Sequence, residues 1–270
     1  MTRLTKEKIL LVNTVSMPLI YFKEADIKIT TDEGKKIFYN GVKAMEKRET
    51  KESVENFNTL LNLFPDSPSV LNNFSVLCAT SLNKPFEAFQ ALEFSINKNP
   101  LSFESRYNLG TFYYSNRAFK EAKSQLMQAN SLTPKNSFVL NNLGLSCLAL
   151  NMTEEAREYF KEIVDTNKDA YFGYHHLAHS YFLENNYELA IEELKKELIL
   201  NENGIAALND LGCFYYYNDD IGNALKYIKK AILSAKDIMK KNNIPMSNAD
   251  ASVRACFFNY GFILEEQENS

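Results

Sequence analysis

The sequence predicts an all-α protein: a superhelix of about six two-helix repeats followed by a C-terminal capping helix. The first observation is the low content of structure-breaking residues, 9 Gly and 7 Pro among 270 residues, which is about half of the ~12% usual for the two together. The second is that 45% of the residues are hydrophobic, enough for a large buried core. The third is a set of similar segments that recur every 34 residues, a period typical of two-helix solenoid repeats.

The recurring segments share a small residue on the first helix of each pair. Three of them align without gaps: YNLGTFYYSNRAFKEA from Tyr107, NNLGLSCLALNMTEEA from Asn141 and NDLGCFYYYNDDIGNA from Asn209. The small position falls on Gly41, Val76, Gly110, Gly144, Ala178, Gly212 and Gly261, at intervals of 35, 34, 34, 34, 34 and 49. A second small residue follows twelve positions later, at Ser53, Ala88, Ala122, Ala156, Ala190 and Ala224. Because small residues on both helices let the backbones approach closely, each segment predicts a helical hairpin.

The expected elements follow in order from this register. Residues 1–33 are an N-terminal apolar, irregular segment, and residues 34–236 are the six repeats. The last interval is 49 rather than 34, which predicts a helix extension and loop over residues 237–250. Residues 251–270 then form the capping helix, a partial seventh repeat. The turns inside the hairpins carry Asn or Pro, where the chain must leave the helix.

The N-terminal segment contains an apolar run of 14 residues, 9–22, behind three basic residues. This run is too short to cross a bilayer, which takes ~20 residues. A secretory signal fits the length, but Asn13 and Pro18 interrupt the run, and no small-residue cleavage site follows. We therefore expect a locally packed segment and a cytoplasmic protein. A periplasmic or secreted location is the alternative if residues 1–25 act as a signal.

With its constant spacing and its paired small residues, the region 34–270 resembles the tetratricopeptide repeat (TPR) family. The resemblance implies a right-handed α-α superhelix in which the first helix of each repeat lines a concave groove. The sequence departs from the family at the closing proline, absent from repeats four to six, and at Glu197, where the family prefers a small residue. The family's carboxylate clamp needs Lys and Arg in the groove. Because Asn, Tyr, Phe and His stand there instead, an acidic chaperone tail is not the expected ligand.

Charge and cysteine content exclude other classes of protein. Lys and Arg number 30 against 34 Asp and Glu, a net charge of −4. Since the signs are mixed along the chain, we expect neither nucleic-acid binding nor insertion into a membrane. The four cysteines form no Cys-x-x-Cys pair and are expected to be buried thiols: Cys78, Cys147, Cys213 and Cys256. Without a nucleophile elbow, a phosphate loop or paired carboxylates, we expect no enzyme activity, no catalytic residue and no cofactor.

The predicted concave groove is poor in charge and rich in aromatic residues and asparagine. Only Glu104 and Asp210 are charged among its 30 positions in repeats two to six, where the chain average of 24% predicts about seven. An asparagine amide can both donate to and accept from the backbone of an extended peptide, and aromatic side chains supply contact area. The expected ligand-binding residues are Asn73, Tyr107, Asn108, Tyr114, Phe138, Asn141, Asn142, His175, His179, Phe182, Asn209 and Tyr216. Among them, Asn108, Asn142 and Asn209 are expected to form one line. The alternative is that the asparagines brace neighbouring helices.

All three histidines of the chain lie in repeat five. His175 and His179 are four residues apart on one helical face, a spacing able to hold a metal ion. We expect no Cys, Asp or Glu to join them and therefore predict no metal site.

These observations predict a non-enzymatic scaffold or adaptor that binds an extended apolar or aromatic-rich peptide segment of a protein partner in its concave groove. Two alternatives stay open. One is a self-assembling structural scaffold, a homo-oligomer formed through the groove and the N-terminal segment. The other is the regulatory TPR region of a longer enzyme.

Overall fold

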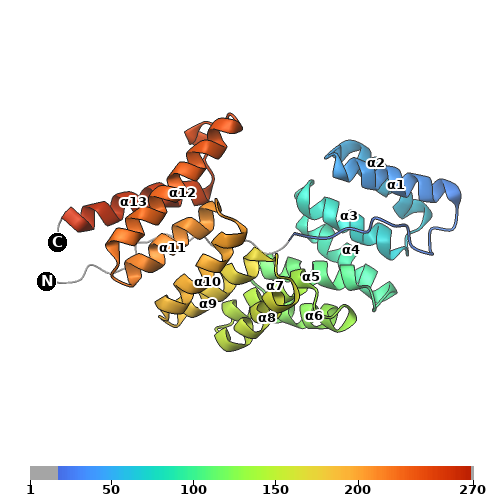
Figure 1. Cartoon of the computed structure of the whole chain (residues 1–270). Helices are drawn as coiled ribbons and strands as arrows, with labels where there is room; N and C mark the ends of the chain where they lie inside the picture. Colours follow the sequence, from blue (N-terminus) through green and yellow to red (C-terminus); the bar gives the residue numbers. More distant parts are fainter. Residues whose placement is uncertain (1–17, 269–270) are drawn as a thin grey trace. The chain divides into compact units, whose positions relative to one another are not determined.

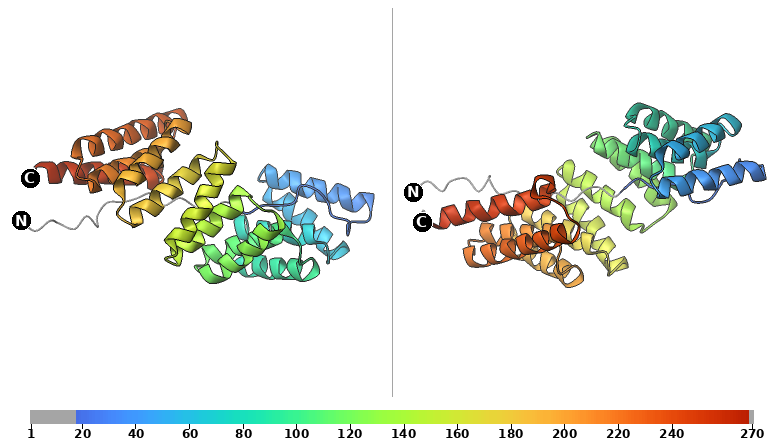
Figure 2. Two further views of the ribbon diagram at one scale, coloured as in Figure 1. Left: turned by 60° about the horizontal axis from the view of Figure 1, so that its bottom comes forward. Right: turned by 90° about the horizontal axis from the view of Figure 1, so that it is seen from above.

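The computed structural model describes residues 18–268, in which consecutive helices follow one another without any β-strand (Figure 1, Figure 2). The α-helices are α1 Asp32–Glu46, α2 Thr50–Leu63, α3 Pro68–Thr80, α4 Pro85–Lys98, α5 Phe103–Ser115, α6 Phe119–Leu132, α7 Ser137–Ala149, α8 Thr153–Thr166, α9 Tyr171–Leu183, α10 Tyr187–Leu200, α11 Ile205–Tyr217, α12 Ile221–Lys241 and α13 Ala251–Glu268. The predicted all-α repeat fold is confirmed. The chain divides into two compact units, whose described parts are residues 18–151 and 152–268.

In the unit 18–151, a side chain caps the start of every first helix. The capping residues are Thr31, Ser67, Ser102 and Asn136, each accepting a hydrogen bond from a backbone N–H of the first turn. Such a cap satisfies a donor that the helix itself leaves unpaired. The capping residues therefore fix where each first helix begins.

The turn that ends each first helix contains one residue in the left-handed backbone conformation, with φ between 52° and 61°. These residues are Arg48, Asn83, Arg117, Asn151, Asn185 and Asp219. Asn and Asp adopt this conformation more easily than other residues with a side chain. The preference for Asn at these turns in the sequence thus has a local backbone cause.

The small residues predicted at the helix crossings lie where two backbones are close. A Cβ atom added to Gly110 of α5 would stand 2.6 Å from Leu126 Cγ of α6, and one added to Gly212 of α11 would stand 2.4 Å from Ile228 Cγ1 of α12. Neither site has room for a methyl group. Gly261 of α13 differs, because nothing lies within 4 Å of its Cβ position. α13 is the last described helix, and no second helix follows it there.

In the second repeat the small position is Ser75 and not Val76, so the expected register was wrong by one residue. Counted from its capping residue, Ser75 occupies the place that Gly110 has in the next repeat, and it is 1% exposed. The turn between α3 and α4 covers residues 81–84, whereas the turn between α5 and α6 covers only 116–118. Because of this extra turn residue, counting twelve residues back from Ala88 gives Val76 in place of Ser75. With the register corrected, Asn73 is the equivalent of Asn108.

In the unit 152–268, α12 runs for 21 residues, and a loop with the short 3-10 helix Met246–Asn248 leads to α13. α13 packs on α11 and α12, and its Cys256 and Ile263 join Ile228 in one apolar cluster. The four cysteines are buried thiols, as predicted. None of the described helices combines the length and apolarity that a membrane span needs.

Candidate functional site

Residues 18–22, here called the docked segment, lie along the first helices α3 and α5. Ile20 N–H donates to Asn108 Oδ1 over 2.8 Å, and Asn108 Nδ2 donates to the Ile20 carbonyl over 2.5 Å. Phe22 makes the same pair of bonds with Asn73: its N–H donates to Asn73 Oδ1 over 2.7 Å, and Asn73 Nδ2 donates to its carbonyl over 2.8 Å. Each asparagine amide therefore satisfies both backbone polar groups of one residue.

The pairing has the period of an extended chain. In a β-strand the N–H and C=O of one residue point to the same side, and residues two apart share that side. Ile20 and Phe22 are two apart, and each faces one amide. The side-chain amides of α3 and α5 thus take the place of a neighbouring strand. We call the surface formed by Asn72, Asn73, Tyr107 and Asn108 the asparagine groove.

Two further residues of the asparagine groove complete the contact. Asn72 Nδ2 donates to the Ile20 carbonyl over 3.1 Å, while its Oδ1 accepts from Asn108 Nδ2 over 3.0 Å. The Tyr107 hydroxyl donates to the Pro18 carbonyl over 3.0 Å. Burial raises the pKa of Tyr107, so the phenol keeps its proton and remains a donor. The asparagine groove therefore binds three alternate residues of the docked segment.

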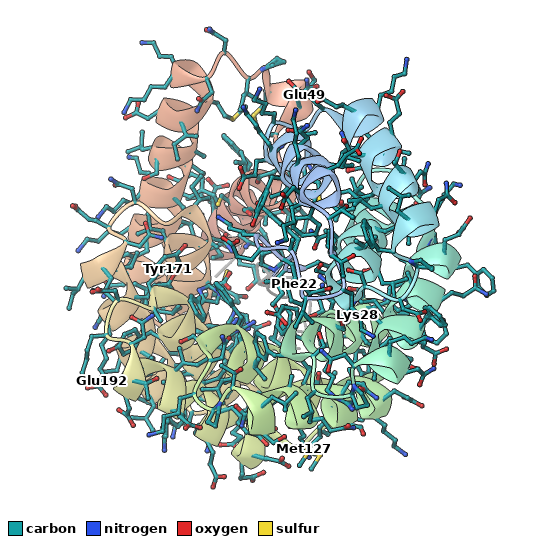
Figure 3. The ribbon with its side chains drawn as sticks, turned by 90° about the vertical axis from the view of Figure 1, so that its right-hand side faces the viewer. Phe22, Lys28, Glu49, Met127, Tyr171 and Glu192 are labelled. Atoms are coloured by element: carbon teal, nitrogen blue, oxygen red, sulfur yellow. The ribbon has the colours of Figure 1, made fainter. Side chains whose placement is uncertain are left out.

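The chain after the docked segment is fixed at the start of α3. Asp26 Oδ2 accepts from Ser67 Oγ and from the backbone N–H of Ser69, both over 2.7 Å. A carboxylate at a helix N-terminus is favoured by the unpaired N–H groups and the helix dipole. Figure 3 shows Phe22 on the inner side of the helices of this unit, with Met127 of α6 on the outer side. Residues 9–17 of the predicted apolar run lie outside the described residues, as does most of the candidate signal 1–25.

Among the predicted groove residues of this unit, three contact the docked segment directly: Asn73, Tyr107 and Asn108. Asn142 reaches it through Tyr107, since its Nδ2 donates to that hydroxyl over 3.4 Å, and Asn141 in turn donates to Asn142 over 3.2 Å. Tyr114 is half-buried, and Phe138 is 44% exposed. Their role in binding a partner stays a prediction. Asn72 was not predicted because of the one-residue register error, since it is the equivalent of Asn141 and Asn209. Asp26 was not predicted because it lies outside the repeats.

The predicted line of asparagines does not extend to Asn209. Counted from the helix start, the equivalent of Asn108 and Asn142 is Asp210, one residue later. Asn209 donates to Asp210 Oδ1 over 2.9 Å and accepts from Asn259 of α13 over 3.0 Å. At this position the asparagine braces neighbouring helices, which is the alternative interpretation.

The other predicted residues of the unit 152–268 pack among aromatic side chains. The Phe182 ring stacks on Phe214 at a centroid distance of 4.6 Å, and Tyr216 donates to Glu266 of α13. Tyr217 meets Phe182 edge to face at 4.9 Å. These contacts hold α9, α11 and α13 together.

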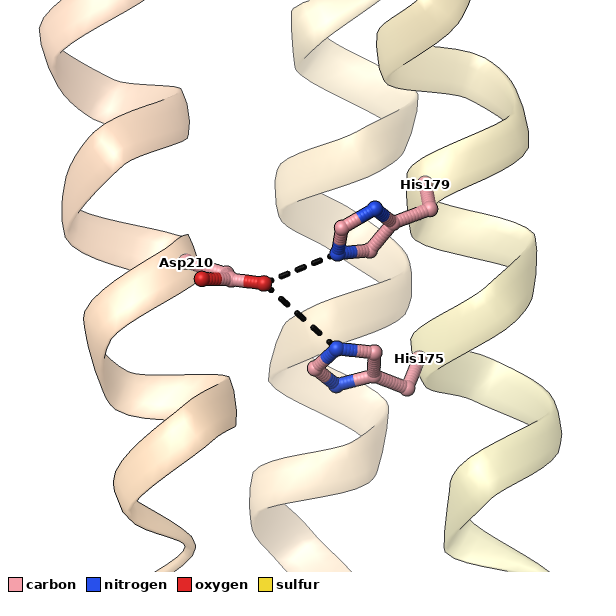
Figure 4. A group of neighbouring side chains, drawn as sticks. All are labelled: His175, His179 and Asp210. Carbon is pink, nitrogen blue, oxygen red and sulfur yellow. Dashed lines mark hydrogen bonds and ion pairs between the residues drawn. The ribbon is translucent and has the colours of Figure 1, made fainter. Parts of the chain in front are cut away.

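Four polar side chains form a histidine cluster in this unit, contributed by α9, α10 and α11: His175, His179, Glu197 and Asp210 (Figure 4 shows three of them). Glu197 Oε2 lies 2.7 Å from His175 Nδ1. Asp210 Oδ2 lies 2.8 Å from His179 Nε2 and 3.5 Å from His175 Nε2. The expectation that no carboxylate joins the histidines was wrong, because the carboxylates come from the two following helices.

Electrostatics favour the charged forms of two members of the histidine cluster, His175 and Asp210. Burial lowers the pKa of His175, but the Glu197 charge and the hydrogen bonds to Asp210 and Glu197 outweigh it and raise the pKa to about 10. Burial raises the pKa of Asp210, and its histidine partners outweigh this and hold the pKa at about 2. His176 is different: burial and the neighbouring imidazoles lower its pKa, and its ring stacks on Phe160 at 4.9 Å. The unusual Glu197 noted in the sequence is thus explained by its buried partner.

Comparisons with known proteins agree with this architecture. The family model described as tetratricopeptide repeat matches residues 103–136, 139–169, 173–198 and 205–238. PilF of Pseudomonas aeruginosa is 18% identical, with 87% of this chain and 98% of that chain aligned at a TM-score of 0.67. MamA of Desulfovibrio magneticus RS-1 is 19% identical, covering 63% of this chain and 97% of its own at a TM-score of 0.58.

A third solved structure is YrrB, described as a TPR protein with an unusual peptide-binding site. It is 19% identical and covers 69% of this chain and 96% of its own, at a TM-score of 0.54. Identities this low show a shared fold alone. The comparison with curated proteins gives no match. The family model, the helix pairs and the 34-residue register agree, and we conclude that the chain belongs to the tetratricopeptide repeat family.

Proposed function

We propose that this protein is a non-enzymatic interaction scaffold that binds an extended segment of a protein partner along α3 and α5. The observation that carries the proposal is the pairing of Asn73 and Asn108 with both backbone polar groups of Phe22 and Ile20. A buried amide left without such partners costs about 1–3 kcal/mol. The asparagine groove therefore favours an occupant with free backbone N–H and C=O groups.

Side chains between the paired residues supply the apolar preference of the proposed ligand. Leu19 and Tyr21 alternate with Ile20 and Phe22, and they line a pocket with Met45 and Leu77. The main-chain bonds accept any residue except proline at the N–H positions, whereas the apolar cluster against which Tyr21 and Phe22 pack favours apolar side chains. A partner segment with apolar residues at alternate positions fits both requirements.

The docked segment is a competitor within the chain for any partner. Nine residues, 23–31, connect it to α1, and a short connection of this kind gives an effective concentration in the millimolar range. If the docked segment by itself has a Kd of ~10 μM for the open groove, an effective concentration of ~1 mM makes any partner bind about 100-fold more weakly to the intact chain. Binding then requires release of residues 18–22.

A peptide-binding experiment tests the proposal on the full chain. The probe is a fluorescein-labelled peptide of residues 18–26. Ile20→Pro removes the N–H that Asn108 accepts, which weakens the docked segment by about 1–3 kcal/mol and should strengthen binding of the added peptide by about 5- to 150-fold. Adding Asn73→Ala and Asn108→Ala should abolish that binding.

The control for the asparagine variants is Asn56→Ala, because Asn56 is half-buried on α2, away from the docked segment, and its amide bonds only its own helix. It should leave peptide binding unchanged. If the Ile20→Pro chain binds the peptide no better than the unmodified chain, or if the asparagine variants bind it equally well, the proposal is wrong.

A second candidate is a homo-oligomer in which the docked segment of one copy occupies the asparagine groove of another. The observation in its favour is that the occupant belongs to the chain itself. Light scattering over a range of concentrations distinguishes the two: an exchanged dimer grows with concentration and disappears in the Asn73→Ala, Asn108→Ala chain. The regulatory region of a longer enzyme stays a prediction.

A further inference from the structure

The histidine cluster contains a buried imidazole nitrogen whose hydrogen bonding is incomplete. His175 is 2% exposed, and its Nε2 has no close hydrogen-bond partner: Asp210 Oδ2 lies 3.5 Å from it. Figure 4 shows this nitrogen directed toward Asp210 Oδ2, which also faces His179 Nε2. At 3.5 Å this contact is longer than the usual ~2.7–3.2 Å of an N–H···O hydrogen bond, and a ligand bound by both atoms would satisfy them better.

The three atoms have the chemistry and spacing of metal ligands. His175, His179 and Asp210 each offer one ligand atom, all within 4.8 Å of one another. Ligands bound at ~2.0–2.2 Å to one ion lie roughly 3–3.5 Å apart. The carboxylate oxygen is 3.5 Å from one imidazole nitrogen and 2.8 Å from the other. A small side-chain rotation that lengthens the 2.8 Å contact between His179 and Asp210 would suit all three atoms to one ion.

The surrounding contacts match those that support metal ligands in proteins. A ligating histidine usually donates its other ring N–H to a carboxylate, and His175 Nδ1 lies 2.7 Å from Glu197 Oε2. A ligating carboxylate is itself hydrogen-bonded, and Asp210 Oδ1 accepts from Asn209 over 2.9 Å. Glu197 thus lies where a carboxylate that does not itself bind the metal would orient the His175 imidazole.

We infer that His175, His179 and Asp210 form a binding site for a divalent transition-metal ion of the zinc class, with Glu197 as the residue that positions His175. Two imidazoles and one carboxylate suit such ions better than Mg²⁺ or Ca²⁺, which prefer oxygen ligands. Three protein ligands leave one coordination position for water or for a partner's side chain. His179 is 13% exposed, so the ion has access to the site from solvent on this side.

The experiment adds Zn²⁺ to the metal-free full chain and follows two signals. Calorimetry with a competing chelator should show one ion bound per chain. Imidazole nitrogen NMR should show shifts at His175 and His179 but not at His176, which is the internal control because its ring is stacked on Phe160. Absence of shifts at His175 and His179 with Zn²⁺ in excess would overturn the inference.

Variants separate this site from unspecific zinc binding. Asp210→Asn and His179→Gln should each lower the zinc affinity by more than ~100-fold, and Glu197→Gln by about 10- to 100-fold, as for outer residues of known sites. Glu192→Gln, an exposed change on the same helix as Glu197, should leave the affinity unchanged. Circular dichroism without metal checks that each variant is folded. Equal affinity in the Asp210→Asn and His179→Gln chains would refute the site.

Discussion

Replacing Asn108 with alanine should release the docked segment while leaving the repeat folded. The change removes the two hydrogen bonds with Ile20, at 2.8 and 2.5 Å, and the one with Asn72, at 3.0 Å. At ~0.5–1.5 kcal/mol for each of the two bonds to Ile20, the segment loses about 1–3 kcal/mol of stability. Its open state should therefore become about 5- to 150-fold more populated. Helix α5 should persist, because alanine is a better helix former than asparagine.

Residue-resolved amide hydrogen exchange measures this effect. The Ile20 amide should exchange about 5- to 150-fold faster in the Asn108→Ala chain, with Phe22 following if the segment opens as one piece. Asn56→Ala on α2 is the matched control, since its amide bonds only the Glu52 carbonyl, at 2.8 Å. Ile20 exchange within twofold of the unmodified chain, in a variant that is still folded, would refute the reasoning.

Three further outcomes are expected. Asn142→Ala should accelerate Ile20 exchange less than Asn108→Ala does, because Asn142 reaches the segment only through a 3.4 Å bond to the Tyr107 hydroxyl. In urea unfolding, Gly212→Ala should destabilise by ~1–3 kcal/mol through overpacking, whereas Gly261→Ala, with open space around its Cβ position, should stabilise by ~0.5–1 kcal/mol. Burial raises the pKa of Cys78 to about 11, so the folded chain keeps a thiol proton that the unfolded chain loses above pH ~8.5. The free energy of unfolding should therefore fall between pH 9 and 11, and it should fall less in the Cys78→Ala chain.

The repeat register was largely predictable because it follows from local packing. A first helix and its second helix are close in sequence, and the small residues at their crossing recur at a fixed distance, as at Gly110 and Ala122. The error at Ser75 shows the limit of this argument. One additional turn residue between α3 and α4 preserves both helices but shifts the count by one. The periodicity alone does not say on which side of the turn the extra residue lies.

The sequence by itself determined the helical hairpins, their order, the buried cysteines and the asparagines as candidates for backbone recognition. Only the tertiary structure decided which groups meet these asparagines: Ile20 and Asn108 are 88 residues apart, and no repeat period relates the irregular segment 18–22 to α5. It also decided the histidine cluster, where Asp210 comes from a position that holds asparagine in three other repeats. The physical reason is the same in both cases. The periodic pattern records contacts that every repeat makes with its neighbour, whereas these sites depend on side chains that differ between repeats and that only the folded chain brings together.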